Sequence, residues 1–272
     1  MKQRICRLNG ERSLAWSDSG TGAPLILLHG WAASRLVFTE LAGLLNNEFR
    51  VLCPDLPGHG HSSAGQDMTL DGLCNELMLW FDELGERPFL LAGWSLGGML
   101  ALELASRDQQ ICSGLVLIGT TPRFVQAEDW PDGLPSIQLR AMQRNLSRKF
   151  DQTLADFFDT TFAGEQISRA RMQEIRRFAI YPSRTPDPKT AATMLELLAG
   201  QDQRHLVKRI AQPTTLIHGR LDQITPPGAA NWLRHELPQA HLEMIDHCGH
   251  APFWSQPKRV AALVREAARW SR

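Results

Sequence analysis

Long apolar runs and net charge are two features that this 272-residue sequence lacks. No apolar stretch approaches the roughly 20 consecutive residues that a membrane-spanning helix needs. The 29 Lys and Arg residues are balanced by 29 Asp and Glu residues, so we expect neither nucleic acid nor a membrane as a partner. Residues 9–12 (NGER) interrupt the start before the apolar core of an export signal could form. We therefore expect a soluble, cytoplasmic protein.

Cysteine is scarce and scattered. The five cysteines include no CxxC pair, so their spacing supports neither a zinc site nor a disulfide framework. We therefore expect free thiols at all five positions, which are Cys6, Cys53, Cys74, Cys112 and Cys248.

Short apolar runs punctuated by glycine and proline alternate with longer segments of helical spacing. This alternation predicts an α/β fold, in which helices flank a mostly parallel sheet. Strands buried on both faces are predicted at Leu25–Leu28, Pro88–Ala92, Leu115–Ile118 and Thr214–Ile217. Weaker strand signals are found at Val51–Leu52 and Leu242–Met244.

The chain changes character in its middle third. Residues from Thr69 to Gly85 still have the apolar spacing of a helix that packs on a sheet. From about residue 120 to 209 the strand-like runs vanish, and helical spacing is interrupted at Pro182, Pro186 and Pro188. We therefore predict an α/β core formed by residues 1–119 and 210–272, with residues 120–209 inserted as a helical cap.

The segment from Gly93 to Gly98 (GWSLGG) lies between a predicted strand and a helical pattern. A G-x-S-x-G elbow requires this context, because a serine on a tight strand-to-helix turn needs small neighbours. The start of a helix also favours an oxyanion, so the backbone N–H of Leu96 is an expected donor. We predict that Ser95 is a nucleophile; the alternative is an incidental serine in a glycine-rich turn.

A serine hydroxyl becomes a nucleophile only when an oriented base removes its proton. Asp222 and His250 each lie in a loop that directly follows a predicted strand. The chain order Ser95, Asp222, His250 matches one of the three triad orders found in unrelated hydrolases. We therefore predict His250 as the general base and Asp222 as the group that orients it.

Two other histidines and one other acid compete for these roles. We interpret His218 and His247 as ordinary loop or core histidines. Asp246 lies on the same short loop as His250, which places it poorly to reach the far ring nitrogen. Asp222 is therefore the preferred acid.

A second oxyanion donor is predicted after the first apolar strand. The segment from His29 to Trp31 (HGW) follows that strand, and Gly30 lets the loop pass close to a reacting carbonyl. The backbone N–H of Trp31 is the expected donor, and we interpret His29 as a brace for the loop. The segment DLPGHGHS at residues 55–62 by itself indicates only a loop.

These segments together resemble the α/β-hydrolase family over nearly the whole chain. In the family's order they are HGW, DLPGHGHS, GWSLGG, HGRLD and GHAPF, the last two at residues 218–222 and 249–253. The resemblance implies acyl transfer from an ester to water, with no metal or organic cofactor. Haloalkane dehalogenases and epoxide hydrolases of this fold carry an aspartate at the elbow, where this chain has Ser95.

Within that family, four segments resemble the esterases that cleave the methyl ester of pimeloyl-acyl-carrier protein in biotin synthesis. They are HGW, GWSLGG, the DWP of residues 129–131 and the HAPF of residues 250–253. This resemblance implies a substrate attached to acyl-carrier protein. The alternatives are a carboxylesterase or lactonase acting on small free esters and, from another functional class, a hydrolase-fold receptor without catalysis. We expect a monomer.

The predicted cap carries two basic clusters. Arg140, Arg144 and Arg148 recur every four residues, opposite an apolar helical stripe, and Lys149 adjoins them. A second cluster consists of Arg169, Arg171, Arg176 and Arg177. The first cluster either binds an acidic carrier or is simply a solvated helix face.

Four aromatic residues are candidates for the lining of an acyl pocket. Core packing is the alternative, especially for the last of them. They are Trp31, Trp94, Phe124 and Phe150.

Overall fold

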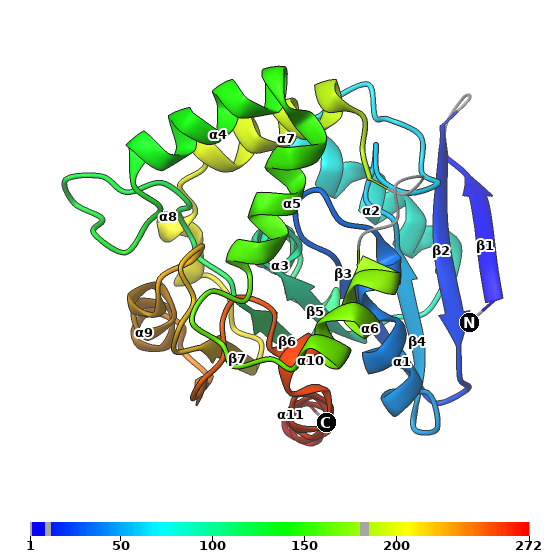
Figure 1. Ribbon diagram of the computed structural model, residues 1–272. Coiled ribbons are helices and arrows are strands. Elements are labelled where there is room, and N and C mark those ends of the chain that lie inside the picture. Colours follow the sequence, from blue (N-terminus) through cyan, green and yellow to red (C-terminus); the bar gives the residue numbers. More distant parts are fainter. Residues whose placement is uncertain (1, 9–11, 180–184, 272) are drawn as a thin grey trace.

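The computed structural model describes residues 2–8, 12–179 and 185–271. In this part of the chain, eight strands form one sheet in the order β1-β2-β4-β3-β5-β6-β7-β8, with helices on both faces (Figure 1). The strands are β1 (Lys2–Arg7), β2 (Ser13–Ser19), β3 (Ala23–Leu28), β4 (Phe49–Pro54), β5 (Phe89–Trp94), β6 (Cys112–Ile118), β7 (Thr214–Gly219) and β8 (Ala240–Ile245). The α/β prediction is confirmed.

The sheet is parallel from β4 to β8 and antiparallel at one edge. β2 pairs antiparallel with both β1 and β4. This edge hairpin was not predicted, because β1 has only one buried residue, Cys6, and β2 mixes serines and Asp18 with its apolar residues. A continuous apolar run is the signature of a strand covered on both faces, and these two strands do not have one.

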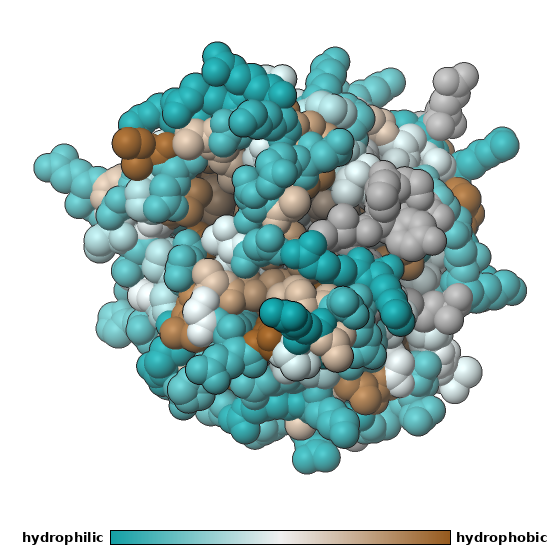
Figure 2. Space-filling view, in the orientation of Figure 1, coloured by the Kyte–Doolittle hydropathy of each residue, from teal (hydrophilic) through white to brown (hydrophobic). Residues whose placement is uncertain are grey.

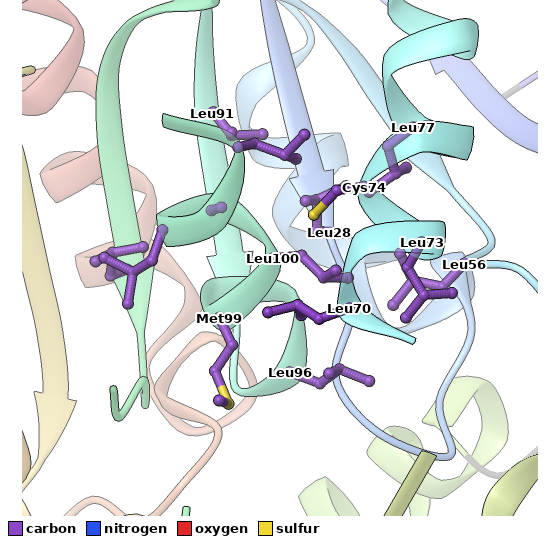
Figure 3. Close-up of a cluster of buried hydrophobic side chains, with 14 of the residues drawn as sticks. Leu28, Leu56, Leu70, Leu73, Cys74, Leu77, Leu91, Leu96, Met99 and Leu100 are labelled. Atoms are coloured by element: carbon purple, nitrogen blue, oxygen red, sulfur yellow. The ribbon is translucent and has the colours of Figure 1, made fainter. Parts of the chain in front are cut away.

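Successive residues of each central strand pack on opposite faces of the sheet. Leu28 and Leu91 belong to one buried cluster, shown with its neighbours in Figure 3, whereas Leu27 and Ala92 belong to the other. The helices of the first face are α2 (Leu70–Leu84), α3 (Leu96–Arg107) and α9 (Pro227–Glu236). Those of the second face are η1 (Arg35–Phe38), α1 (Thr39–Leu45), α10 (Pro252–Ser255) and α11 (Pro257–Trp270).

The signals expected at the ends of α2 are present. The hydroxyl of Thr69 accepts a hydrogen bond from the N–H of Gly72 at 3.2 Å, and Gly85 ends the helix in the left-handed conformation. The stripe between them packs against the sheet and α3. The predicted helix is therefore confirmed with its start and stop.

Residues 120–209, which we continue to call the cap, hold the helices between β6 and β7. They are α4 (Ser136–Arg148), α5 (Phe150–Thr160), α6 (Arg169–Ala179), α7 (Pro188–Gly200) and α8 (Arg204–Val207). Figure 1 shows α4, α5 and α7 gathered at the top of the view. Pro188 starts α7, with Asp187 as its N-cap, whereas Pro182 lies outside the described residues. None of the helices that the structure describes is long and apolar enough to cross a membrane.

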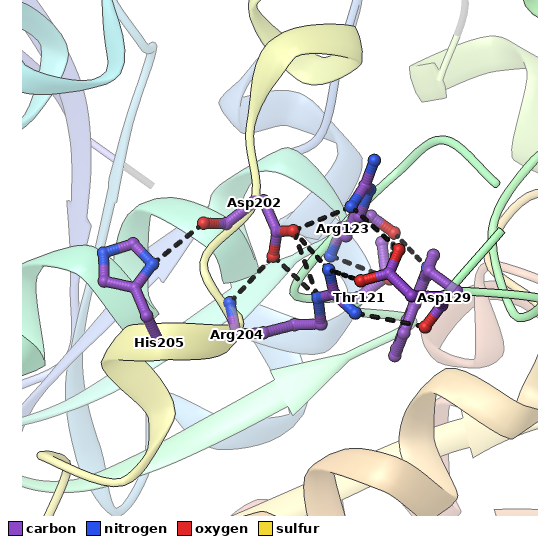
Figure 4. A network of polar contacts seen from close by, with 7 residues as sticks. Thr121, Arg123, Asp129, Asp202, Arg204 and His205 are labelled. Carbon is purple, nitrogen blue, oxygen red and sulfur yellow. Dashed lines mark hydrogen bonds and ion pairs between the residues drawn. The ribbon is translucent and has the colours of Figure 1, made fainter. Parts of the chain in front are cut away.

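A polar network ties the beginning of the cap to its end (Figure 4). Arg123 forms an ion pair with Asp202 at 2.8 Å, and Arg204 forms ion pairs with Asp202 and Asp129 at 2.6 and 2.7 Å. The Arg204 guanidinium also lies 5.5 Å from the ring centre of Trp130. Asp129 and Trp130 of the DWP segment thus help to hold the two ends of the cap together.

Candidate active site

Ser95 lies on the turn between β5 and α3. Its backbone has φ 55° and ψ −115°, a strained conformation for a residue other than glycine. The Ser95 N–H donates to the carbonyl of Ile118 at 3.0 Å, and the Ser95 carbonyl accepts from the N–H of Met99 at 3.1 Å. The strained turn is therefore anchored both to the end of β6 and to the first turn of α3.

Two glycines make room for this turn. A Cβ atom at Gly93 would lie 2.2 Å from the carbonyl oxygen of Gly97, and a Cβ atom at Gly97 would lie 2.1 Å from the carbonyl oxygen of Leu28. Neither contact is possible with a side chain, so both positions require glycine. The second contact also brings the start of α3 against the loop that follows β3.

Asp222 and His250 come together from the loops after β7 and β8. His250 Nδ1 lies 2.8 Å from Asp222 Oδ2, and both side chains are fully buried. The Asp222 carboxylate also accepts from the N–H groups of Ile224 and Thr225, each at 2.9 Å, and from the Thr225 hydroxyl at 2.8 Å. Burial opposes ionisation, but the attraction and hydrogen bond of His250, with smaller contributions from His218 and the N–H of Thr225, hold the pKa of Asp222 below its ordinary value.

The second ring nitrogen of His250 differs from the first in its surroundings. His250 Nε2 is buried and has no hydrogen-bond partner among the described residues. With the proton of Nδ1 directed at Asp222, Nε2 carries the lone pair that can accept another proton. The His250 carbonyl accepts from Trp94 Nε1 at 2.9 Å, and a Cβ atom at Gly119, just after β6, would lie 3.1 Å from His250 Nδ1. The imidazole therefore lies at the same end of β6 that anchors Ser95.

The loop after β3 approaches Ser95 from another side. A Cβ atom at Gly30 would lie 3.3 Å from the Cβ atom of Ser95, which shows how closely the backbone passes. Within the part of the chain that the structure describes, the backbone N–H groups of Trp31 and Leu96 donate to no acceptor. Two unused donors thus lie on the two segments that flank the serine, as an oxyanion site requires.

The competing residues occupy other places. Asp246 is exposed and forms an ion pair with Arg220 at 2.6 Å, and His247 is also exposed. His218 is buried behind the acid: its Nε2 lies 2.7 Å from the carbonyl oxygen of Thr225 and 3.4 Å from Asp222 Oδ2. No three His, Cys, Asp or Glu side chains are arranged to hold a metal ion within the described ranges.

His29 and the loop after β4 brace the loop that carries Trp31. His29 Nε2 accepts from the N–H of Leu56 at 2.9 Å, and Nδ1 lies 2.9 Å from the Gly30 carbonyl oxygen. Burial lowers the pKa of His29 to about 4, so the ring is neutral at physiological pH. Asp55, also buried, forms an ion pair with Arg35. The DLPGHGHS segment, which indicated only a loop, is therefore part of the scaffold behind the site.

The family of this chain is shown by a match to the model of the alpha/beta hydrolase fold, which covers residues 23–257. The chain belongs to the α/β-hydrolase family. The match includes the elbow of Ser95, the loop that carries Asp222 (the acid loop) and the loop that carries His250 (the base loop). The resemblance seen in the short segments therefore extends over most of the chain.

Curated relatives of this α/β-hydrolase are similar over nearly their whole length. A pimeloyl-[acyl-carrier protein] methyl ester esterase of Nitrosomonas europaea is 39% identical over 92% of this chain and 97% of its own. An esterase of the same name from Chromobacterium violaceum is 35% identical over 91% of this chain and 94% of its own.

Solved structures share the fold at lower sequence identity. An esterase from Exiguobacterium antarcticum superposes with a TM-score of 0.86, at 22% identity over 94% of this chain and 95% of its own. A bromoperoxidase from Bacillus anthracis has a TM-score of 0.90, at 20% identity over 98% of this chain and all of its own. These two proteins share one fold but are named for different activities, so the likeness supports the fold of this chain and not its activity.

Two cavities of this α/β-hydrolase flank Phe157 of α5. One, of about 310 Å³, is lined by Trp31, Trp94 and other mostly apolar side chains. The other, of about 490 Å³, is lined by Phe124 together with amides, hydroxyls and further apolar groups. Phe150 belongs to neither lining and packs on the core.

Phe157 borders both cavities but was not among the residues that the sequence analysis singled out. Its ring packs edge-on against Trp31, with 4.9 Å between the ring centres. Its only sequence signal was an apolar position in an amphipathic helix, which is equally typical of a core residue.

The two basic clusters of the cap differ in their surroundings. Within the described residues, the exposed side chains of Arg140, Arg144 and Arg148 on α4 form no ion pair. On α6, by contrast, Arg171 pairs with Glu40 of the core and Arg176 pairs with Asp159. The two clusters look alike in the sequence, but part of the α6 cluster forms contacts within the protein.

Proposed function

We propose that this chain is a serine ester hydrolase in which Ser95 is the nucleophile, His250 the general base and Asp222 the orienting acid. The observation that carries the proposal is a buried His250 whose Nδ1 is bound to Asp222 and whose Nε2 has no partner among the described residues, at the same end of β6 that anchors the strained Ser95. Such an arrangement activates a hydroxyl that is otherwise a weak nucleophile.

The reaction proceeds in two acyl transfers. Ser95 Oγ attacks the ester carbonyl while its proton passes to His250 Nε2, and the oxyanion that forms accepts hydrogen bonds from the N–H groups of Trp31 and Leu96. The proton then passes to the departing alkoxide, which leaves as an alcohol. A water molecule, deprotonated in turn by His250, attacks the acyl-serine; the bond to Ser95 Oγ breaks, His250 returns the proton to that oxygen, and the carboxylic acid is released.

The substrate we propose is the methyl ester of pimeloyl-acyl-carrier protein, hydrolysed in biotin synthesis. The names of the curated relatives support this choice at 39% and 35% identity. With a methyl ester the alcohol released is methanol, so all the recognition must come from the acyl side, which is a long chain attached to a carrier protein. A docking surface on the cap is then expected beside a cavity that can hold that chain.

Helix α4 provides both features. Its residues Gln138, Met142 and Asn145 line the larger cavity, whereas its arginines lie on the exposed side. Figure 2 shows hydrophilic side chains along the upper rim, where α4 lies in Figure 1, and more apolar ones in the hollow below. Because these arginines have no partner within the described part of the chain, they are available to an acidic carrier.

An exposed apolar residue extends this surface. Ile137 has 68% of its surface exposed, and the helical repeat places it on the same stripe as Arg144 and Arg148. A carrier that presents acidic side chains around one apolar residue would complement the stripe. The amide- and hydroxyl-containing lining of the larger cavity suits the amide-rich arm of such a carrier.

Genetic rescue tests this proposal. The chain is expected to restore growth without biotin in a strain that lacks its own pimeloyl-acyl-carrier-protein methyl ester esterase, and Ser95→Ala is expected not to. Hydrolysis of a short-chain nitrophenyl ester by a protein that fails to rescue would favour a general carboxylesterase. Absence of both activities would favour a receptor.

A further inference from the structure

The loop that presents His250 is held by the cap as well as by the core. The N–H of Gly249 donates to Oε1 of Glu165 at 2.7 Å, and the N–H of His250 donates to the carbonyl of Thr161 at 2.9 Å. Both acceptors lie in the cap segment that follows α5. Two successive N–H groups of the base loop are therefore bound to the cap.

The fit between this cap segment and the base loop is tight. A Cβ atom at Gly249 would lie 2.4 Å from the carbonyl oxygen of Thr161 and 2.9 Å from Oε1 of Glu165. Glu165 is half-buried, and burial raises the pKa of its carboxyl group, with a smaller contribution from the negative charge of Asp222. The Ser255 side chain and the N–H of Gly249 oppose this shift. The Glu165 carboxylate thus occupies a position where burial disfavours its charge, and its Oε1 accepts the hydrogen bond from the base loop.

We propose that Glu165 is a positioning residue for the general base: through Gly249 it fixes the loop so that His250 Nε2 stays directed at the reacting groups. The inference rests on the proposed role of His250. During each turnover this nitrogen must take a proton from Ser95 and deliver it to the leaving oxygen, so the ring needs one fixed orientation. The cap then takes part in the chemistry of every ester, whatever its size or charge.

This role differs from substrate selection, although both belong to the cap. The arginines of α4 lie outside both cavity linings, whereas Thr161 lines the smaller cavity and its carbonyl binds the base loop. Changing Glu165 should therefore alter kcat on all substrates, and reversing the α4 charges should alter KM on carrier-linked substrates only.

Three variants test the hydrogen bond. Glu165→Ala removes the acceptor and is expected to lower kcat by about tenfold or more, with KM within about twofold, on a small nitrophenyl ester and on a carrier-linked ester alike. Glu165→Gln keeps an acceptor oxygen and is expected to return kcat to within about threefold of the wild type. Glu196→Ala, an exposed glutamate on α7, is the matched control and should change neither constant.

Gly249→Ala tests the same contact from the other side. The added methyl group must displace the cap segment. As a single change, Gly249→Ala is therefore expected to lower kcat as Glu165→Ala does. The proposal can then still be tested if Glu165→Ala does not fold. The double variant should lose less than the sum of the two single losses, because both changes break the contact between Gly249 and Glu165, while Gly249→Ala also displaces Thr161. Melting temperatures identify variants with a damaged fold.

Several results would overturn the inference. These are a folded Glu165→Ala protein with kcat within twofold of the wild type, a Glu165→Gln protein as slow as Glu165→Ala, or fully additive losses in the double variant. Ser95→Ala, measured in the same assays, reports on the proposed function by itself: activity retained there contradicts the nucleophile, whereas unchanged kcat in the Glu165 variants contradicts only the positioning role.

Discussion

Polar groups of the core loops and of helix α4 in the cap are used in opposite ways. Asp222 is fully buried and accepts hydrogen bonds from the Ile224 and Thr225 amides, the Thr225 hydroxyl and His250. The arginines of α4 are exposed and, within the described residues, unpaired. The first arrangement fixes one geometry before any substrate arrives, and the second leaves charge available for a partner. Chemistry and recognition should therefore respond to different mutations.

The same contrast exists inside the cap. Arg171 joins α6 to the core through Glu40 and the carbonyl of Trp254, and Arg176 lies over the ring of Phe158. These two arginines of α6 bind other parts of the protein, whereas the three arginines of α4 form no ion pair within the described residues. A cluster of arginines in a sequence is thus no indication of a docking surface until the partners of each one are known.

The largest effect is expected from Ser95→Ala. Loss of the nucleophile should lower kcat on every ester by about a thousandfold or more, while the fold is unchanged because little buried area is removed. Steady-state kinetics with a small ester and a carrier-linked ester measure this loss. A folded variant that keeps more than about a tenth of the wild-type kcat would rule out Ser95 as the nucleophile.

Acid should weaken the core scaffold through two buried histidines. Burial is the main reason that the pKa values of His29 and His59 are lowered to about 4 and about 3, compared with about 6.5 in an unfolded chain. Below pH 6.5 the unfolded chain binds more protons than the folded one, so the free energy of unfolding falls as the pH drops. Each histidine should contribute a loss on the order of 1 kcal/mol between pH 7.5 and 5.5.

Urea unfolding at the two pH values measures this loss. In a His59→Gln variant the difference between pH 7.5 and 5.5 should be smaller than in the wild type by roughly 1 kcal/mol. An equal difference in both proteins would show that His59 does not remain neutral in the folded core.

Charge reversal on α4 should affect recognition alone. Changing Arg140, Arg144 and Arg148 to Glu is expected to raise KM for a carrier-linked ester by roughly tenfold, because attraction to an acidic partner is lost. The kcat/KM for a small uncharged ester should stay within about twofold, and high salt should weaken the carrier reaction of the wild type.

A matched control reverses three exposed arginines of the core, Arg7, Arg234 and Arg269, which changes the net charge equally. This control should retain its KM for the carrier-linked ester. An equal rise in both variants would mean that overall charge, rather than α4, determines the encounter. No rise in either would make the α4 stripe a solvated helix face.

The smallest effect is expected on α6. Arg176→Gln removes an ion pair between half-exposed groups, which should cost less than about 1 kcal/mol of unfolding free energy. The preference for a carrier-linked ester should not change. A loss of that preference would place the docking surface on α6 and remove the distinction between the two clusters.

The parts predicted from the sequence are those whose signal is local. A tight turn between a strand and a helix requires small residues, which the sequence shows as glycines around Ser95. Parallel strands place their carboxyl ends at one edge of the sheet, so the loops of Asp222 and His250 are expected there. The contacts missed join distant segments: Phe157 to Trp31, Arg35 to Asp55, and Glu165 to Gly249. A phenylalanine on a helix or a glutamate after one has no feature that identifies its partner, so these roles emerged only from the packing.

The most direct test compares one acyl chain in two forms. The methyl ester of pimeloyl-acyl-carrier protein and the same methyl ester without its carrier present an identical group to Ser95, so any difference in kcat/KM comes from recognition outside the core loops. We predict at least tenfold higher kcat/KM for the carrier-linked ester at low salt, a difference that shrinks at high salt and after reversal of the α4 charges. Equal kcat/KM for the two esters would contradict the assignment of recognition to the cap.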